Sequence, residues 1–376
     1  MAIRTFTRRF FILGNIITVA VFLMACANAF LHPDKWWFIA ILGLAFPFLL
    51  LLVFIFLIGW LLARSRWVFL SLAALLLGFT NIRALIGFHF FADEYNEKKP
   101  ANSIRILTWN VKWFDEQTRE DGRESARLKM LEFIRQQNAD VLCFQEYFEP
   151  GPNGPYSNFK DFKKIGYPYF YRAIDYGKKD TRYEMGSAIF SKYPILDSSR
   201  TSFMGPVELR AAESMLSIDI EVDGQPLRIY TAHLQSVLLQ KKDYRDIAII
   251  RNAEDSIVAA SKSLIRKLRQ GYSLRGDQVD IVRAKLDSCT LPEVFCGDFN
   301  DVPNSYTYFR IRGNRRDAFT EKELGIGRTF SNLSPTLRID YIMTDKQFEI
   351  LQYKRKVVPY SDHYPVIADL RLPGRK

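Results

Sequence analysis

Residue types that could do chemistry gather at the ends of predicted strands. The clearest case is the stretch 294–303, where an apolar run and a glycine are followed by Asp298, Asn300 and Asp301. The apolar run predicts a short buried strand, and Pro303 prevents further strand pairing. Such charged ends cost desolvation free energy unless a metal ion, another cation or water meets them. Taken alone, the stretch is equally consistent with an Asx turn that caps a strand.

The same pattern recurs at other predicted strand ends. Beyond residue 92 the chain has only two histidines, His233 and His363, and each lies at such an end. A single strand-end histidine is more often structural, but two of them beside several carboxylates indicate a common site. The other polar strand ends are Asn110, Gln145-Glu146, Asp340 and Asp362.

Hydrolysis of a phosphate ester requires this set of groups. Mg²⁺ binds one or two carboxylates and keeps several of its waters. An attacking water must be oriented and deprotonated, and cations or N–H donors must meet the charge on the phosphate oxygens. The four cysteines have no CxxC spacing, which argues against a zinc site or a disulfide scaffold. The net charge of +11 suits an anionic substrate or a membrane surface.

Strands that recur with few helices between them must position these groups. We expect a mixed sheet or a sandwich of two sheets with outer helices, because hairpins mix with crossovers. An Asp223-Gly224 pair predicts a hairpin between strands 215–222 and 227–232. The other expected strands are 104–109, 141–144, 186–191, 294–296, 338–343 and 366–370, and the expected helices are 125–137 and 247–268.

The first 92 residues predict a membrane anchor. Residues 10–31 and 36–62 are apolar runs. The second run has no charged residue and is longer than the ~20 residues that are needed to span a bilayer. A third run, 67–91, is interrupted by Arg83, so it either spans with Arg83 facing other helices or lies at the interface. For the first run, a cleaved signal peptide, with a lipoprotein-type site at Cys26, is the alternative.

Basic residues near these runs predict an orientation in the cell (inner) membrane. Arg4, Arg8 and Arg9 precede the first run, and Arg64 and Arg66 follow the second. By the positive-inside rule the N-terminus is cytoplasmic, and three spans place everything after residue 92 outside the cytoplasm. If the third run does not span, that part of the chain is cytoplasmic. We expect a linker over 93–103 and a catalytic domain over 104–376.

From about residue 104 to its end, the chain resembles the endonuclease/exonuclease/phosphatase superfamily, which has the deoxyribonuclease-I-like fold. The order of the matching segments along the chain makes the resemblance specific. It implies a four-layer α/β sandwich of two packed sheets flanked by helices. The segments are Thr108-Trp109-Asn110, Gln145-Glu146, 186–191, Ala232-His233, Gly297-Asp298-Phe299-Asn300, Arg338-Ile339-Asp340-Tyr341 and 361–366.

The resemblance also implies a role for each matching residue. Glu146 is similar to the main Mg²⁺ ligand, with Asn110 beside it and Asp362 near or on the metal; Mn²⁺ is an alternative ion. Asp298 is similar to the residue that orients or deprotonates the attacking water, and Asn300 to its partner on the phosphate.

Two histidines complete the set that the resemblance implies. His363 is similar to the imidazole at the scissile phosphate, oriented by Asp340. His233 is similar to the second histidine, which stabilises the pentavalent phosphorus or protonates the leaving oxygen. How base and acid roles divide between Asp298 and the histidines stays open.

The substrate is less closely specified than the reaction. The family favours a metal-dependent phosphodiesterase acting on nucleic acid, although no stripe of basic residues interleaved with aromatics is present. The predicted anchor favours a phospholipid or sphingomyelin headgroup, and His233-Leu234-Gln235-Ser236 resembles a sphingomyelinase motif in part. A non-enzymatic membrane-bound binding module is a third hypothesis. Beyond the substrate and the lipid bilayer, no protein partner is indicated.

Overall fold

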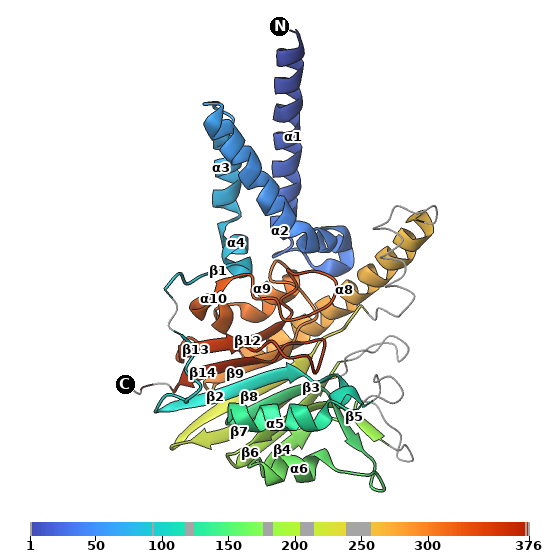
Figure 1. Cartoon of the computed structure of the whole chain (residues 1–376), viewed down its shortest axis with the longest axis vertical. Helices are drawn as coiled ribbons and strands as arrows, with labels where there is room; N and C mark the ends of the chain where they lie inside the picture. The colour runs from blue at the N-terminus through green and yellow to red at the C-terminus, as the bar shows by residue number, and fades with distance from the viewer. Residues whose placement is uncertain are drawn as a thin grey trace. The chain divides into compact units, whose positions relative to one another are not determined.

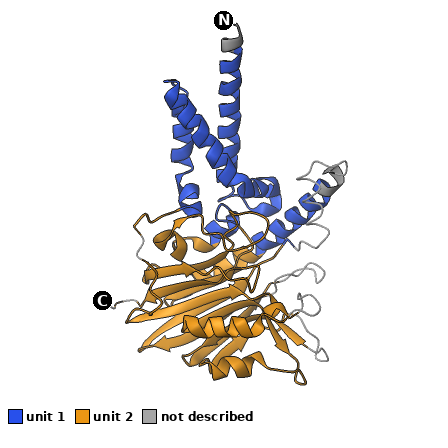
Figure 2. Ribbon diagram, in the orientation of Figure 1, with its two compact units in different colours: residues 1–86, 237–277, 302–310 blue, residues 87–236, 278–301, 311–376 orange. Residues whose placement is uncertain are grey.

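A computed structural model describes residues 2–91, 94–116, 124–175, 183–203, 214–237, 257–372 and 374. The chain forms two compact units (Figure 2). Unit 1 contains Met1–Ile86, Val237–Asp277 and Val302–Arg310, and unit 2 contains Gly87–Ser236, Gln278–Asp301 and Ile311–Lys376. The predicted division at residues 92 and 104 remains a prediction.

Unit 1 is built mainly from apolar helices. Helices α1 (Ala2–Ala27) and α2 (Pro33–Leu62) are long and apolar enough to cross a membrane. Helices α3 (Val68–Leu77) and α4 (Phe79–Leu85) are bent by 65° and form a third candidate span if the bent pair counts as one. The described residues therefore offer two or three candidate spans, as the apolar runs predict.

The helical part of the third apolar run ends at Leu85, before residue 91. The bend lies at Gly78, where a Cβ would come within 2.7 Å of the Phe22 ring, so glycine allows α1 to approach closely. Beyond Leu85 the chain becomes extended, and β1 (Gly87–Phe88) pairs with β11 (Leu324–Gly325). Because residues 87–88 bond to a strand, helix cannot continue through them.

Unit 2 contains two six-stranded mixed sheets, and this confirms the predicted fold class (Figure 1). One sheet has the order β13-β14-β2-β3-β5-β4, and the other has the order β10-β12-β9-β8-β7-β6. The strands are β2 (Ser103–Asn110), β3 (Val141–Pro150), β4 (Tyr169–Arg172), β5 (Tyr183–Ser191), β6 (Ile195–Ser202), β7 (Ser214–Val222), β8 (Gln225–His233), β9 (Glu293–Asp298), β10 (Arg316–Asp317), β12 (Asp340–Thr344), β13 (Glu349–Arg355) and β14 (Val366–Arg371).

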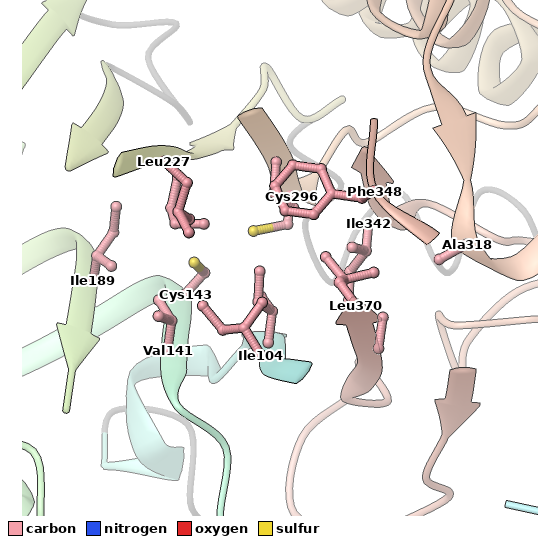
Figure 3. Close-up of a cluster of buried hydrophobic side chains, with 14 of the residues drawn as sticks. Ile104, Val141, Cys143, Ile189, Leu227, Cys296, Ala318, Ile342, Phe348 and Leu370 are labelled. Atoms are coloured by element: carbon pink, nitrogen blue, oxygen red, sulfur yellow. The ribbon is translucent and has the colours of Figure 1, made fainter. Parts of the chain in front are cut away.

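Alternation of side chains along the strands separates two cores. Ile104 and Ile106 of β2 join the core shared by both sheets, which Figure 3 shows together with Cys143 and Cys296. Leu107 and Trp109 of the same strand point the other way. There they pack with α5 (Arg127–Gln137) and α6 (Asn158–Lys164), which cover the outer face of this sheet.

Two details of the secondary structure concern the expected turn and helix. The Asp223-Gly224 turn joins β7 to β8 as predicted, and both residues have positive φ (53° and 82°), which a two-residue hairpin of this hand requires. The expected helix 247–268 lies partly outside the described residues; its described part belongs to α8 (Ile257–Asp287), which continues well beyond residue 268. The described residues also form η1 (Lys112–Asp115), α9 (Tyr306–Arg312) and α10 (Ala318–Lys322).

Strand pairing brings the polar strand ends together. Parallel pairing of β8 with β9 places His233 opposite Asp298, and antiparallel pairing of β9 with β12 places Asp298 opposite Asp340. In the other sheet, parallel β2 and β3 place Asn110 opposite Gln145. Carboxyl ends of parallel strands lie at one edge of a sheet, which is where sites form in α/β proteins.

Candidate active site

The loop after β9 is shaped by one glycine. Gly297 has φ +141°, and a Cβ there would lie 2.1 Å from the carbonyl oxygen of Ala232 on β8. Only glycine fits both the backbone conformation and the close approach of the two strands. The next residue, Asp298, is therefore delivered to the strand end with its side chain fully buried.

Asp298, Asp340 and His363 form a buried cluster whose potential ligand atoms lie within 4.8 Å of one another. The Nδ1 atom of His363 lies 3.1 Å from both carboxylate oxygens of Asp340, and its Nε2 atom lies 3.7 Å from Oδ2 of Asp298. Burial alone would lower the pKa of His363, but the charges of Asp340 and Asp298 outweigh it and raise that pKa to about 10. The two carboxylates therefore favour the protonated imidazole.

Hydrogen bonds connect the loop that carries His363 to the end of β2. The indole Nε1 of Trp109 donates to the carbonyl oxygen of His363 at 2.8 Å. The hydroxyl of Ser361 donates to the carbonyl oxygen of Asn110 at 2.8 Å and accepts from the backbone N–H of His363 at 3.1 Å. These bonds explain why Trp109-Asn110 and Ser361-Asp362-His363, far apart in sequence, belong to one site.

His233 completes the cluster from the end of β8. Its Nε2 atom lies 3.6 Å from Oδ2 of Asp298 and 3.9 Å from Oε1 of Glu146. The two histidines thus face the same Asp298 oxygen from different strands, as the sequence pattern predicts for a common site. Burial raises the pKa of Asp298, while the histidines on either side lower it.

Asn110 links the β9 cluster to Glu146. Its Nδ2 atom donates to Oε1 of Glu146 and to Oδ2 of Asp298, both at 3.1 Å, and its Oδ1 accepts from the backbone N–H of Lys112. One amide therefore holds two carboxylates at a fixed separation. The expected neighbours Asn110, Glu146 and Asp298 are brought together.

Glu146 sits on a bulge of β3. The pairing of β3 with β5 shifts register between Phe144 and Tyr147, and Glu146 has φ +51°. A bulge turns a side chain away from its ordinary direction, and here it brings the Glu146 carboxylate to Asn110 and His233. Burial raises the pKa of Glu146, and the charge of Asp362 raises it further. Two carboxylates that repel each other in this way form a set that a divalent cation would stabilise.

Two predicted residues are held differently from the rest. The Asn300 amide donates to the carbonyl oxygen of Leu234 at 2.8 Å, and its backbone N–H donates to Oδ1 of Asp298 at 2.8 Å. Asn300 therefore ties the β9 loop to the residue that follows His233. Arg338, which belongs to the matching segment before Asp340, is fully buried and pairs with Asp317 at 2.6 Å.

Lys112 is a charged group at the site that was not expected from the sequence. Its Nζ atom lies 3.0 Å from Oδ2 of Asp362, and its side chain is partly exposed. Residues 112–115 all have positive φ, from 45° to 65°, an uncommon backbone conformation that clusters at functional sites. The position of Lys112, two residues after Asn110, was the only available signal.

Comparisons with known proteins agree with this geometry. A model described as Endonuclease/Exonuclease/phosphatase family matches residues 107–363. The chain belongs to this family. A second model, described as a domain of unknown function, matches residues 8–85. The family assignment confirms the resemblance identified in the sequence.

Solved structures show the fold of the family. An endonuclease/exonuclease/phosphatase from Beutenbergia cavernae is 19% identical, with a TM-score of 0.50 over 73% of this chain and 72% of that one. The catalytic domain of human nocturnin with a bound sulfate anion is 15% identical, with a TM-score of 0.50 over 73% of this chain and 96% of that one. Among curated proteins, no match was found.

Proposed function

We propose that this chain is a membrane-anchored, Mg²⁺-dependent phosphodiesterase that acts on nucleic acid. The observation that carries the proposal is the buried Asp298–Asp340–His363 cluster, with His233 and Glu146 next to it. The family supplies the reaction class, the hydrolysis of a phosphate ester. The apolar helices α1 and α2 support the anchor.

The carboxylates of Glu146 and Asp362 would hold the metal ion, with Asn110 positioning Glu146. These residues fit Mg²⁺ because their oxygen donors are hard ligands. Burial and the charge of Asp362 raise the pKa of Glu146, so the charged carboxylate is destabilised, and a bound cation would offset this. When bound, a divalent cation neutralises charge on the phosphate oxygens.

The remaining residues divide into a base and two imidazoles. The Asp298 carboxylate, fixed by Asn110 and by the backbone N–H of Asn300, orients the attacking water and accepts its proton. His363 is charged at neutral pH and therefore donates a hydrogen bond to the scissile phosphate instead of acting as a base. To His233 we assign the protonation of the leaving oxygen.

A lipid headgroup is the second candidate substrate. The observation that favours it is the pair of long apolar helices, which would keep the enzyme at a bilayer and so raise the local concentration of lipid substrates. On either substrate the chemistry at phosphorus is the same. We further propose that the N-terminus is cytoplasmic and, if α3 and α4 together span, that the site faces away from the cytoplasm.

Substrate profiling of the full chain in lipid nanodiscs tests the proposal. Plasmid DNA, RNA, sphingomyelin vesicles and inositol phosphates are compared with Mg²⁺ and with chelator. We expect Mg²⁺-dependent cleavage of nucleic acid that Asp298→Asn and His363→Ala abolish. The matched control Asp197→Asn, at an exposed position of β6, leaves the rate unchanged.

Each other outcome has a definite meaning. Cleavage of sphingomyelin alone selects the lipid alternative. Activity that survives chelation, or that Asp298→Asn leaves intact, contradicts the mechanism. Binding without turnover of any substrate identifies a binding module. A periplasmic reporter fused after residue 100 tests the orientation, since a purely cytoplasmic signal means that α3 and α4 do not span.

A further inference from the structure

The loop that follows the proposed catalytic motif is held inside the helical unit. Unit 2 ends this stretch at Asp301, and the next residues, Val302–Arg310, pack as part of unit 1. On this stretch the chain passes from one unit to the other between Asp301 and Val302, three residues after Asp298. Whatever fixes residues 302–310 acts on the catalytic loop through the chain itself.

Asn304 ties this loop to the apolar helices of unit 1. Its side chain is 1% exposed. Its Oδ1 accepts from Nδ2 of Asn81 on α4 at 2.7 Å, and its Nδ2 donates to the carbonyl oxygen of Ala25 on α1 at 3.0 Å. Its backbone carbonyl accepts from Nδ2 of Asn28 at 2.8 Å. Both ends of the amide and the main chain are thus engaged.

Helix α2 also packs against this hydrogen-bonded group. A Cβ on Gly43 of α2 would lie 2.5 Å from Nδ2 of Asn28 and 2.6 Å from the carbonyl oxygen of Asn304. Only glycine therefore lets α2 approach this hydrogen bond. We call Asn28, Asn81, Asn304 and Gly43 the asparagine clasp.

Buried amides in an apolar helix bundle are costly unless their hydrogen bonds are made. The clasp engages both ends of the Asn304 amide, and Asn81 also donates to the carbonyl oxygen of Cys26 at 3.1 Å. Removing one partner would leave buried polar groups unpaired. The clasp therefore specifies one position of the loop more strongly than apolar packing would.

Only five residues separate Asn304 from Asp298, and several of them are fixed by hydrogen bonds. On the unit 2 side, Phe299 N–H donates to the carbonyl oxygen of Ile339 at 2.8 Å, and the Tyr341 hydroxyl donates to that of Asp301 at 2.9 Å. Between Asp301 and Asn304 lie only Val302 and Pro303, and proline fixes its own φ. A displacement of Asn304 is therefore transmitted towards Asp298 and Asn300.

We propose that Asn304 is a positioning residue and that the apolar helices, through the asparagine clasp, hold the loop carrying Asp298 and Asn300 in its active geometry. The N-terminal helices are then part of the catalytic unit as well as a tether. This inference rests on the proposed function of Asp298, but the clasp itself is tested independently of any substrate.

A matched control lies within the same helices. Asn15 of α1 is fully buried and accepts from the Ser71 hydroxyl of α3 at 3.0 Å, a second amide contact between apolar helices that does not involve the loop. Asn15→Ala removes a buried amide from the bundle just as Asn81→Ala does. Only Asn81→Ala removes a partner of Asn304.

The test compares hydrogen exchange and steady-state kinetics of the full chain in nanodiscs. In Asn81→Ala and Asn304→Ala, we expect faster deuterium uptake in the peptide covering 298–305 and a fall in kcat of about tenfold to a hundredfold, with KM nearly unchanged. Asn15→Ala behaves like the wild type in both measurements.

Two results would overturn the inference. One is unchanged exchange of peptide 298–305 in Asn81→Ala and Asn304→Ala. The other is an equal loss of kcat in Asn15→Ala, which would show a general weakening of the bundle. If the wild type cleaves none of the substrates, the proposed function fails, and the exchange measurement still decides whether the clasp orders the loop.

Discussion

The contact between His363 and Asp340 leads to a quantitative prediction. Replacing Asp340 with asparagine removes a carboxylate 3.1 Å from Nδ1 of His363 while keeping nearly the same shape. The rise of the His363 pKa from 6.5 to about 10 corresponds, at 1.36 kcal/mol per pKa unit, to about 5 kcal/mol in favour of the imidazolium. Burial opposes this charge, and Asp340 is the largest favourable contribution, followed by Asp298.

In Asp340→Asn we therefore expect the His363 pKa to fall by several units, to neutrality or below. At pH 7.5 His363 then changes from a charged to a neutral group, and kcat falls by about 10²- to 10³-fold, the usual effect of losing one donor to a developing oxyanion. The chain has four histidines, so NMR of histidine-labelled protein resolves the titration once His363→Gln assigns the signal.

The titration is performed in chelator, because the charge of a bound divalent cation would itself lower the histidine pKa. Asp197→Asn serves as the control, since it removes an exposed carboxylate of β6. A wild-type His363 pKa near 6.5, unchanged in Asp340→Asn, would refute the electrostatic reasoning. An unchanged kcat despite a lowered pKa would refute the proposed role of the imidazolium.

Three further predictions follow from single contacts. The raised pKa of His363 contributes stability that is fully present below pH 6.5 and is lost as pH rises through about 10, so the unfolding midpoint should fall more steeply over this range in the wild type than in His363→Gln. Gly297→Ala should abolish activity, and the strained φ alone should lower the free energy of unfolding by at least about 1 to 3 kcal/mol. Chemical denaturation measures this loss, and wild-type stability would contradict the close approach to Ala232. Lys112→Ala should weaken substrate binding in KM more than Lys112→Arg does, since its charge lies at the site, and equal KM values in both variants and the wild type would exclude the contact.

The sequence was sufficient for the fold class because its strands carry strong local signals. Alternation in 104–109 and the Asp223-Gly224 turn specify their own structures, and both are found. The convergence of His233 and Asp298 depends instead on parallel pairing of β8 with β9, which no local pattern encodes. It was inferred from the presence of two histidines at strand ends and from the order of the family motifs.

Features that depend on tertiary contacts could not be predicted from the sequence. Lys112 looks like any surface lysine until the loop of Asp362 lies beside it. The apolar run at 67–91 cannot reveal that Gly78 packs on Phe22 or that residues 87–88 join a strand. Asn81 and Asn304 are ordinary polar residues in sequence, and only their burial and mutual hydrogen bond distinguish them.

Separating metal binding from turnover tests the central claim most directly. Mn²⁺ binding to the full chain is followed by electron paramagnetic resonance, alongside the rate of phosphodiester cleavage in the same samples. We predict that Glu146→Gln loses both binding and cleavage, whereas Asp298→Asn keeps Mn²⁺ binding and loses cleavage. Cleavage by Asp298→Asn at the wild-type rate, or wild-type Mn²⁺ affinity in Glu146→Gln, would contradict the account of this site.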